Sequence, residues 1–102
     1  MNKKNNDWKK VEPIQADVWD YKKVPEVIGV LIDKRDNVGP NNSKMYTLEQ
    51  PDGKLINVWG STVLDSRMGI IPIGTEIRIV YLGLATSPKT KREYHNFEVW
   101  TR

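Results

Sequence analysis

The sequence has 102 residues, 38% of them hydrophobic and 28% charged, and its 16 basic and 13 acidic side chains give a formal net charge of +3 at pH 7. This length corresponds to one domain with one modest hydrophobic core. The absence of cysteine and the single histidine, His95, exclude a disulfide framework, a thiolate nucleophile, a cysteine-ligated metal and a two-histidine site. The composition favours a binding or structural module over an enzyme, and no cofactor is expected.

The basic excess lies at the two ends of the chain. Residues 1–23 carry six lysines against four acidic residues, and residues 84–102 carry four basic residues against two acidic ones. Residues 24–83 have six basic and seven acidic side chains. We interpret residues 1–23 as a polar, lysine-rich and partly disordered N-terminal arm, and residues 24–102 as the folded domain.

The sequence shows neither a membrane-spanning segment nor a signal peptide. No stretch approaches the roughly 18 apolar residues of a membrane span, and the N-terminus lacks the apolar run of a signal peptide. With the absence of cysteine, this predicts a cytoplasmic protein that does not contact a membrane.

Three strands are predicted in the first part of the domain. Residues 27–32 form a continuous run rich in β-branched side chains, which favours a strand, and Gly29 within it predicts a bulge or a tight bend. Turn-forming residues at 36–42 close this strand. The next strands are predicted at residues 43–50 and 54–60.

The turn between the second and third strands predicts how they pair. Pro51 suits the second position of a type I turn, and Gly53 suits the left-handed bulge position after it. Such a three-residue loop pairs Gln50 with Lys54, and the cross-strand neighbours follow from that register: Leu48 with Ile56, and Tyr46 with Val58. A two-residue loop is the alternative, and it would place Tyr46 opposite Trp59.

In the first register, the hairpin has an apolar face and a mixed face. The apolar face is expected in the core, and its members are Tyr46, Leu48, Ile56 and Val58. The other face is expected to be a mixed surface, and its members are Met45, Thr47, Asn57 and Trp59. We expect the indole of Trp59 to be exposed there.

A short helix and two further strands complete the domain. The helix is predicted at residues 61–69, because Thr62 and Asp65 have the spacing of a capping box and Gly69 is a natural stop. The strands are predicted at residues 74–84 and 92–101. His95 alternates with apolar residues in the last strand, so a partly buried, hydrogen-bonded histidine is expected there rather than a catalytic base.

This order of elements predicts an all-β fold. Three strands, a short helix and two strands match a five-stranded Greek-key OB-fold barrel with the helix between the third and fourth strands and the N-terminal arm outside it. An SH3-like barrel is the nearest alternative. Trp19 and Tyr21 alternate in the arm, which predicts an extra strand or a segment that packs on the barrel.

Several segments of the sequence resemble small phage-type OB-fold proteins of the single-stranded DNA-binding kind. They lie at residues 25–31, 39–43, 57–62, 74–79 and 94–99, with Tyr46, and together they span residues 24–101. The resemblance implies single-stranded DNA binding in phage-like replication or recombination. Bacterial single-stranded DNA-binding proteins carry an acidic tail that recruits partners, whereas this sequence ends directly after its last predicted strand, so recruitment through a tail is not expected.

Binding of a single strand needs exposed rings on which bases stack and cations along the phosphates. Trp59 is the leading candidate ring, with Asn57 beside it, and Tyr94 and Trp100 are further candidate rings. The candidate cations come from three strands and one loop: Lys34, Arg35, Lys44, Arg78, Lys89, Lys91 and Arg92. The opposite interpretation, in which Trp59 lies in the core or packs under the N-terminal arm and the charges are merely solvated, stays open.

Other functions also stay open at this point. A protein–protein adaptor could use the same barrel, and RNA could replace DNA, because a stacking platform does not read the sugar. A homo-oligomer is an open alternative to a monomer, because one small barrel covers only about 4–16 nucleotides. Trp8 could contact a ligand or a subunit. Catalysis and metal binding are not expected, since the carboxylates lack a recognisable spacing and no glycine-rich phosphate loop is present.

Overall fold

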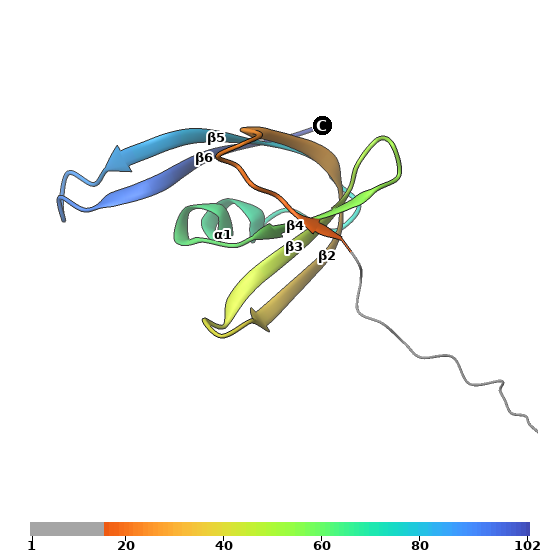
Figure 1. Ribbon diagram of the computed structural model, residues 1–102, viewed down its shortest axis with the longest axis horizontal. Helices are drawn as coiled ribbons and strands as arrows, with labels where there is room; N and C mark the ends of the chain where they lie inside the picture. Colours follow the sequence, from red (N-terminus) through yellow and green to blue (C-terminus); the bar gives the residue numbers. More distant parts are fainter. Residues whose placement is uncertain (1–15) are drawn as a thin grey trace, which may run out of the picture.

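One curled β-sheet contains all the strands of residues 16–102, which are the residues that the computed structural model describes (Figure 1). The elements in chain order are β1 (Asp17–Val18), β2 (Glu26–Val38), β3 (Ser43–Glu49), β4 (Leu55–Trp59), α1 (Thr62–Met68), β5 (Glu76–Thr86) and β6 (Glu93–Thr101). The order across the sheet is β1-β4-β3-β2-β5-β6. Only the β1–β4 pair is parallel.

The long strand β2 is the centre of the sheet. Its residues 26–30 pair with β5 and its residues 30–38 pair with β3, so the sheet curls along β2 into a half-barrel beside α1 (Figure 1). Gly29 allows this arrangement, because a Cβ at that position would lie 2.8 Å from the carbonyl oxygen of Glu49. The pairing of β2 with β3 shifts in register twice, between Leu31 and Asp33 and between Arg35 and Val38, and not at Gly29.

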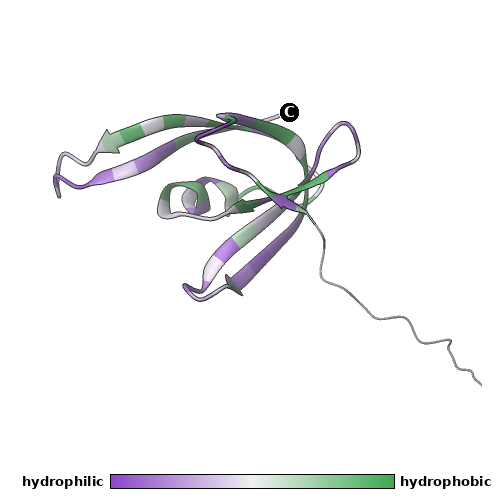
Figure 2. Ribbon diagram, viewed as in Figure 1, coloured by the Kyte–Doolittle hydropathy of each residue, from purple (hydrophilic) through white to green (hydrophobic). Residues whose placement is uncertain are grey.

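The core fills the inside of the half-barrel. Figure 2 shows the hydrophobic residues concentrated on β5 and on the adjoining part of β2, while the β2–β3 hairpin is mainly hydrophilic. The core comprises residues from every strand except β1, from α1 and from two connecting segments: Trp19, Val27, Leu31, Tyr46, Leu48, Val58, Leu64, Met68, Ile71, Ile77, Ile79 and Phe97. These side chains are at most 7% exposed.

The predicted register of the β3–β4 hairpin is confirmed. Tyr46 pairs with Val58 and Leu48 pairs with Ile56, as the three-residue loop requires. The backbone N–H of Gln50 donates to the carbonyl oxygen of Lys54 at 2.8 Å. Gly53 has a φ of +86°, which is the left-handed conformation that the bulge position needs.

The helix lies where it was predicted, but its cap differs. The N-cap is Ser61, whose side-chain oxygen accepts a hydrogen bond from the backbone N–H of Leu64 at 3.3 Å. The predicted capping box of Thr62 and Asp65 is therefore wrong. The Asp65 carboxylate instead accepts a hydrogen bond of 2.6 Å from the hydroxyl of Tyr46, which ties α1 to β3.

The sheet has one strand more than the five that the sequence predicted. The additional strand, β1, runs parallel to β4, and after it the backbone N–H of Trp19 donates to the carbonyl oxygen of Asn57 on β4 at 2.8 Å. The Trp19 ring is 6% exposed and its centroid lies 6.0 Å from that of Phe97 on β6. The segment around Trp19 therefore bridges the two ends of the sheet, as both an extra strand and a packed segment. The predictions for residues 1–15, including Trp8 and the partial disorder, lie outside the described residues.

Candidate nucleic-acid interface

The β3–β4 face opposite the core exposes only one of its four predicted members. Trp59 is 41% exposed, whereas Met45, Thr47 and Asn57 are 5%, 0% and 6% exposed. The Thr47 hydroxyl donates to the amide oxygen of Asn57 at 2.7 Å, and the Arg35 guanidinium lies 3.3 Å from the sulfur of Met45. Three of the four residues are thus buried. The expectation of a broad mixed surface is therefore wrong: this face exposes the ring of Trp59, and the other three predicted members are buried.

The Trp59 indole is held by the turn between β2 and β3. Gly39 has a φ of +75°, and a Cβ on it would lie 3.2 Å from the Cη2 atom of the indole. A glycine at this position lets the turn approach the ring closely. Part of the ring surface stays open to solvent, as a base-stacking platform requires.

Two of the predicted cations, Arg35 and Lys44, have carboxylate partners within the protein. Nε of Arg35 lies 3.3 Å from the carboxylate of Asp33. Nζ of Lys44 lies 2.6 Å from the carboxylate of Asp36, and this contact raises the pKa of Lys44. Arg35 pairs with Met45 across β2 and β3 and so shares the face of Trp59. Lys44 precedes Met45 on β3 and is therefore on the opposite face, beside Ser61 and Asp65. Both cations are already paired.

Lys34 lies elsewhere. Its ammonium group donates to the carbonyl oxygen of Met68 at 3.0 Å, at the last residue of α1. A cation at a helix C-terminus is favourable because the last carbonyl groups lack partners within the helix. Lys34 therefore stabilises α1 and does not line the face that carries Trp59.

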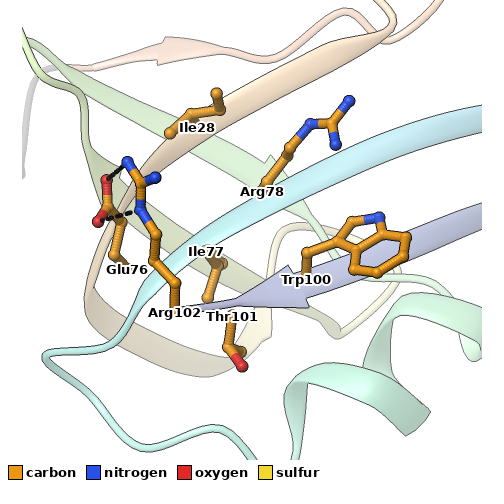
Figure 3. Close-up of a pocket in the computed structure, with 7 residues that line it drawn as sticks. All are labelled: Ile28, Glu76, Ile77, Arg78, Trp100, Thr101 and Arg102. Atoms are coloured by element: carbon orange, nitrogen blue, oxygen red, sulfur yellow. Dashed lines mark hydrogen bonds and ion pairs between the residues drawn. The ribbon is translucent and has the colours of Figure 1, made fainter.

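A second group of candidates lies on the β2–β5–β6 face opposite the core. Ile28, Arg78 and Trp100 are direct cross-strand neighbours, and Figure 3 shows them beside a shallow pocket. The pocket has a volume of about 150 Å³, and Trp100 is 53% exposed. The side chain of Ile28, the guanidinium of Arg78 and the indole of Trp100 therefore lie in one row across the three strands.

Carboxylates neutralise the cations of this second group. Arg78 forms an ion pair with Glu26. Arg102 donates two hydrogen bonds to the carboxylate of Glu76, at 3.0 and 3.3 Å (Figure 3), and this guanidinium lowers the pKa of Glu76. Sequence reasoning missed Arg102 and Glu76, because they are 26 residues apart and only the β5–β6 register brings them together.

The third group lies at the end of the β5–β6 hairpin, which projects from the body of the molecule (Figure 1). It consists of Lys89, Lys91 and Arg92 in the turn and Tyr94 on the adjoining strand. All four side chains are exposed, and within residues 16–102 the three cations form no ion pair. These cations are free to meet an anionic ligand.

His95 is partly buried and hydrogen-bonded, as its position in the last predicted strand indicated. Its Nδ1 lies 2.7 Å from the hydroxyl of Tyr81, and the Tyr21 ring packs on it with centroids 5.3 Å apart. In the described part of the chain, no three histidine, aspartate or glutamate side chains gather as a metal site would require. No helix there is long and apolar enough to cross a bilayer.

The structure thus brings the predicted residues together in three groups and leaves two cations, Lys34 and Lys44, outside them. Trp59 is grouped with Arg35 and the buried Asn57, Arg78 with Trp100, and Tyr94 with the three cations of the hairpin turn. Comparisons of the chain with protein-family models, curated proteins and solved structures found no match.

Proposed function

We propose that residues 24–102 are an OB-fold that binds single-stranded DNA with little sequence preference. We place this binding in phage-like DNA replication or recombination in the cytoplasm, without catalysis. The strand order β4-β3-β2-β5-β6, with α1 between β4 and β5, supports the fold assignment, because the OB-fold is a five-stranded, partly open Greek-key barrel. In this interpretation β1 is an addition from the N-terminal arm.

The exposed indole of Trp59 is the observation that carries the proposal. OB-folds bind oligonucleotides on the face of their second and third strands, which correspond to β3 and β4. A ring that is 41% exposed on this face offers a surface on which any base can stack, and such stacking contributes about 1–3 kcal/mol per base. Because every base has a π-face, this contact gives binding with little sequence preference.

The cations of the β5–β6 turn supply the second requirement. OB-folds use the loop between their last two strands as a border of the binding face, and Lys89, Lys91 and Arg92 lie in that loop. Arg35, Lys44 and Arg78 would have to exchange a carboxylate partner for a phosphate, so they contribute less. We therefore expect moderate affinity that decreases steeply as the salt concentration rises, since each phosphate contact releases counterions.

The test is a titration of three labelled ligands of equal length, about 16 nucleotides: oligo-dT, oligo-U and a DNA duplex. Fluorescence anisotropy at low and high salt measures binding of the full chain. We expect oligo-dT to bind at low salt, to dissociate as salt is added, and to bind more tightly than the duplex. Absence of single-strand binding at low salt, equal binding of the duplex, or tighter binding of oligo-U would each contradict the proposal.

A further inference from the structure

Arg35 on β2 lies in the same row of the sheet as Trp59. Arg35 pairs with Met45 and Met45 pairs with Trp59, so the three residues occupy neighbouring strands on the face opposite the core. Since neighbouring strands lie about 5 Å apart, the backbones of Arg35 and Trp59 are about 10 Å apart. Met45 between them is 5% exposed, whereas Trp59 is 41% exposed. A ring and a cation on either side of one buried side chain offer positions for the base and the phosphate of one nucleotide.

Arg35 keeps hydrogen-bonding capacity that the fold does not use. Its Nε lies 3.3 Å from the Asp33 carboxylate, but within residues 16–102 this buried atom has no hydrogen-bond partner. The guanidinium donates to the sulfur of Met45 at 3.3 Å, and a thioether is a weak acceptor. By comparison, Lys44 donates a hydrogen bond of 2.6 Å to Asp36. Because a guanidinium has several N–H donors and this side chain is 36% exposed, a phosphate can reach it from solvent.

Asp33 is the residue that competes with such a phosphate. It alternates with Arg35 along β2 and pairs with Thr47, which places its carboxylate on the same face as the indole of Trp59. The Asp33 side chain is 35% exposed. An ion pair this open to solvent is weak, so a phosphate can displace the carboxylate. The negative charge of Asp33 beside the guanidinium nevertheless reduces the attraction that the phosphate gains.

We propose that Arg35 binds the phosphate of the nucleotide whose base stacks on Trp59, and that Asp33 limits the affinity by competing for Arg35. This inference rests on the proposed binding of single-stranded DNA and adds to it the carboxylate that sets its strength. Asp33 acts through Arg35 and does not itself contact the nucleic acid. Removing its charge should therefore strengthen binding.

The test is the affinity of Asp33→Asn for labelled oligo-dT, measured by fluorescence anisotropy. Salt of about 0.15 M is suitable, because charges more than about 8 Å apart are then largely screened. We expect the variant to bind about two- to fivefold more tightly than the natural chain, which corresponds to the release of one exposed ion pair. The slope of log K against log salt should steepen by about 0.7, for one further phosphate contact. Unchanged or weaker binding would overturn the proposal.

The matched control is Asp36→Asn. It also removes one negative charge from β2 and also frees a cation, Lys44, but that cation lies beside Ser61 and Asp65 on the face opposite Trp59. We therefore expect its affinity to change less than about twofold. A gain as large as that of Asp33→Asn would assign the effect to net charge and refute a specific role of Asp33.

A double variant establishes whether Asp33 acts through Arg35. Arg35→Gln alone should weaken binding, and in the double variant D33N/R35Q most of the gain from Asp33→Asn should disappear. A gain of equal size with and without the guanidinium would show that Asp33 merely repels the strand, which contradicts the proposal. Circular dichroism compares the folding of all variants, and Asp33→Ser is measured in parallel so that the result does not depend on one variant.

Failure of this inference differs from failure of the proposed function. If oligo-dT binds and Trp59→Ala weakens it, while Asp33→Asn and Arg35→Gln bind like the natural chain, only the role of this ion pair is refuted. If neither the natural chain nor Asp33→Asn binds a single strand at low salt, the proposed function is refuted as well.

Discussion

The Trp59 indole lies against Gly39 of the β2–β3 turn, so closely that a Cβ on the glycine would be 3.2 Å from the ring. Two segments 20 positions apart in the sequence are thereby fixed to each other. The glycine leaves space for the ring, and its positive φ of +75° is a conformation that few other residues adopt without strain. The turn thus orients the exposed ring of the proposed binding face.

Replacing this ring should weaken binding without unfolding the protein. Trp59→Ala removes one stacking surface, which corresponds to a loss of about 1–3 kcal/mol, or roughly 5- to 150-fold in affinity for oligo-dT. Because the side chain is 41% exposed, the circular dichroism spectrum should stay unchanged. Anisotropy titrations of the variant and the natural chain measure the difference.

Trp59→Phe is the matched control, since it keeps a smaller ring and should lose less affinity than the alanine variant. Equal affinity of Trp59→Ala and the natural chain would remove Trp59 from the binding site. Unfolding of that variant would instead assign the ring to the core.

A second prediction concerns the hydrogen bond between Tyr46 and Asp65. The Tyr46 side chain is 2% exposed and its hydroxyl donates to the carboxylate at 2.6 Å. A hydrogen bond to a charged group contributes about 1.5–3 kcal/mol, so Tyr46→Phe should lower the free energy of unfolding by about this amount. Urea denaturation measures it. Tyr94→Phe is the control, because that hydroxyl is at the surface, and it should leave the midpoint unchanged.

The same tyrosine predicts a loss of stability at alkaline pH. Burial, followed by the hydrogen bond to Asp65, raises the pKa of the Tyr46 hydroxyl, while an unfolded tyrosine ionises near pH 10. Above that pH the unfolded state loses this proton and the folded state keeps it, so stability decreases as the pH rises. The difference in unfolding free energy between the natural chain and Tyr46→Phe should therefore shrink between about pH 8 and pH 11. A constant difference would show that the hydroxyl ionises equally in both states.

The pairing of β3 with β4 could be predicted from the sequence because it depends on a short local signal. Pro51 and Gly53 specify the turn, and the turn specifies the register of every residue up to Tyr46 and Val58. Which face is exposed was harder to predict. Thr47 and Asn57 are polar, but they form a hydrogen bond with each other and are buried, and alternation alone does not show whether a face is covered.

The partners of the cations could not be predicted, because they come from distant parts of the chain. Arg78 and its partner Glu26 are 52 residues apart, and Lys34 and the Met68 carbonyl are 34 residues apart. Each contact depends on the curl of β2 and on the position of α1, which no local pattern specifies. The bulge between Tyr81 and Gly83 also breaks the alternation on which sequence interpretation rests.

The last prediction separates cations that contact DNA from cations that stabilise the fold. If Lys89, Lys91 and Arg92 each contact a phosphate, the triple variant K89Q/K91Q/R92Q should reduce the slope of log K against log salt by about 2, because each contact to a single strand contributes about 0.7. Lys34→Gln is the control with one positive charge fewer. It removes the hydrogen bond to Met68, so it should lower the urea midpoint and leave the salt slope unchanged. A triple variant with the natural slope would place the phosphates elsewhere. A reduced slope in Lys34→Gln would show that this cation leaves the helix to bind DNA.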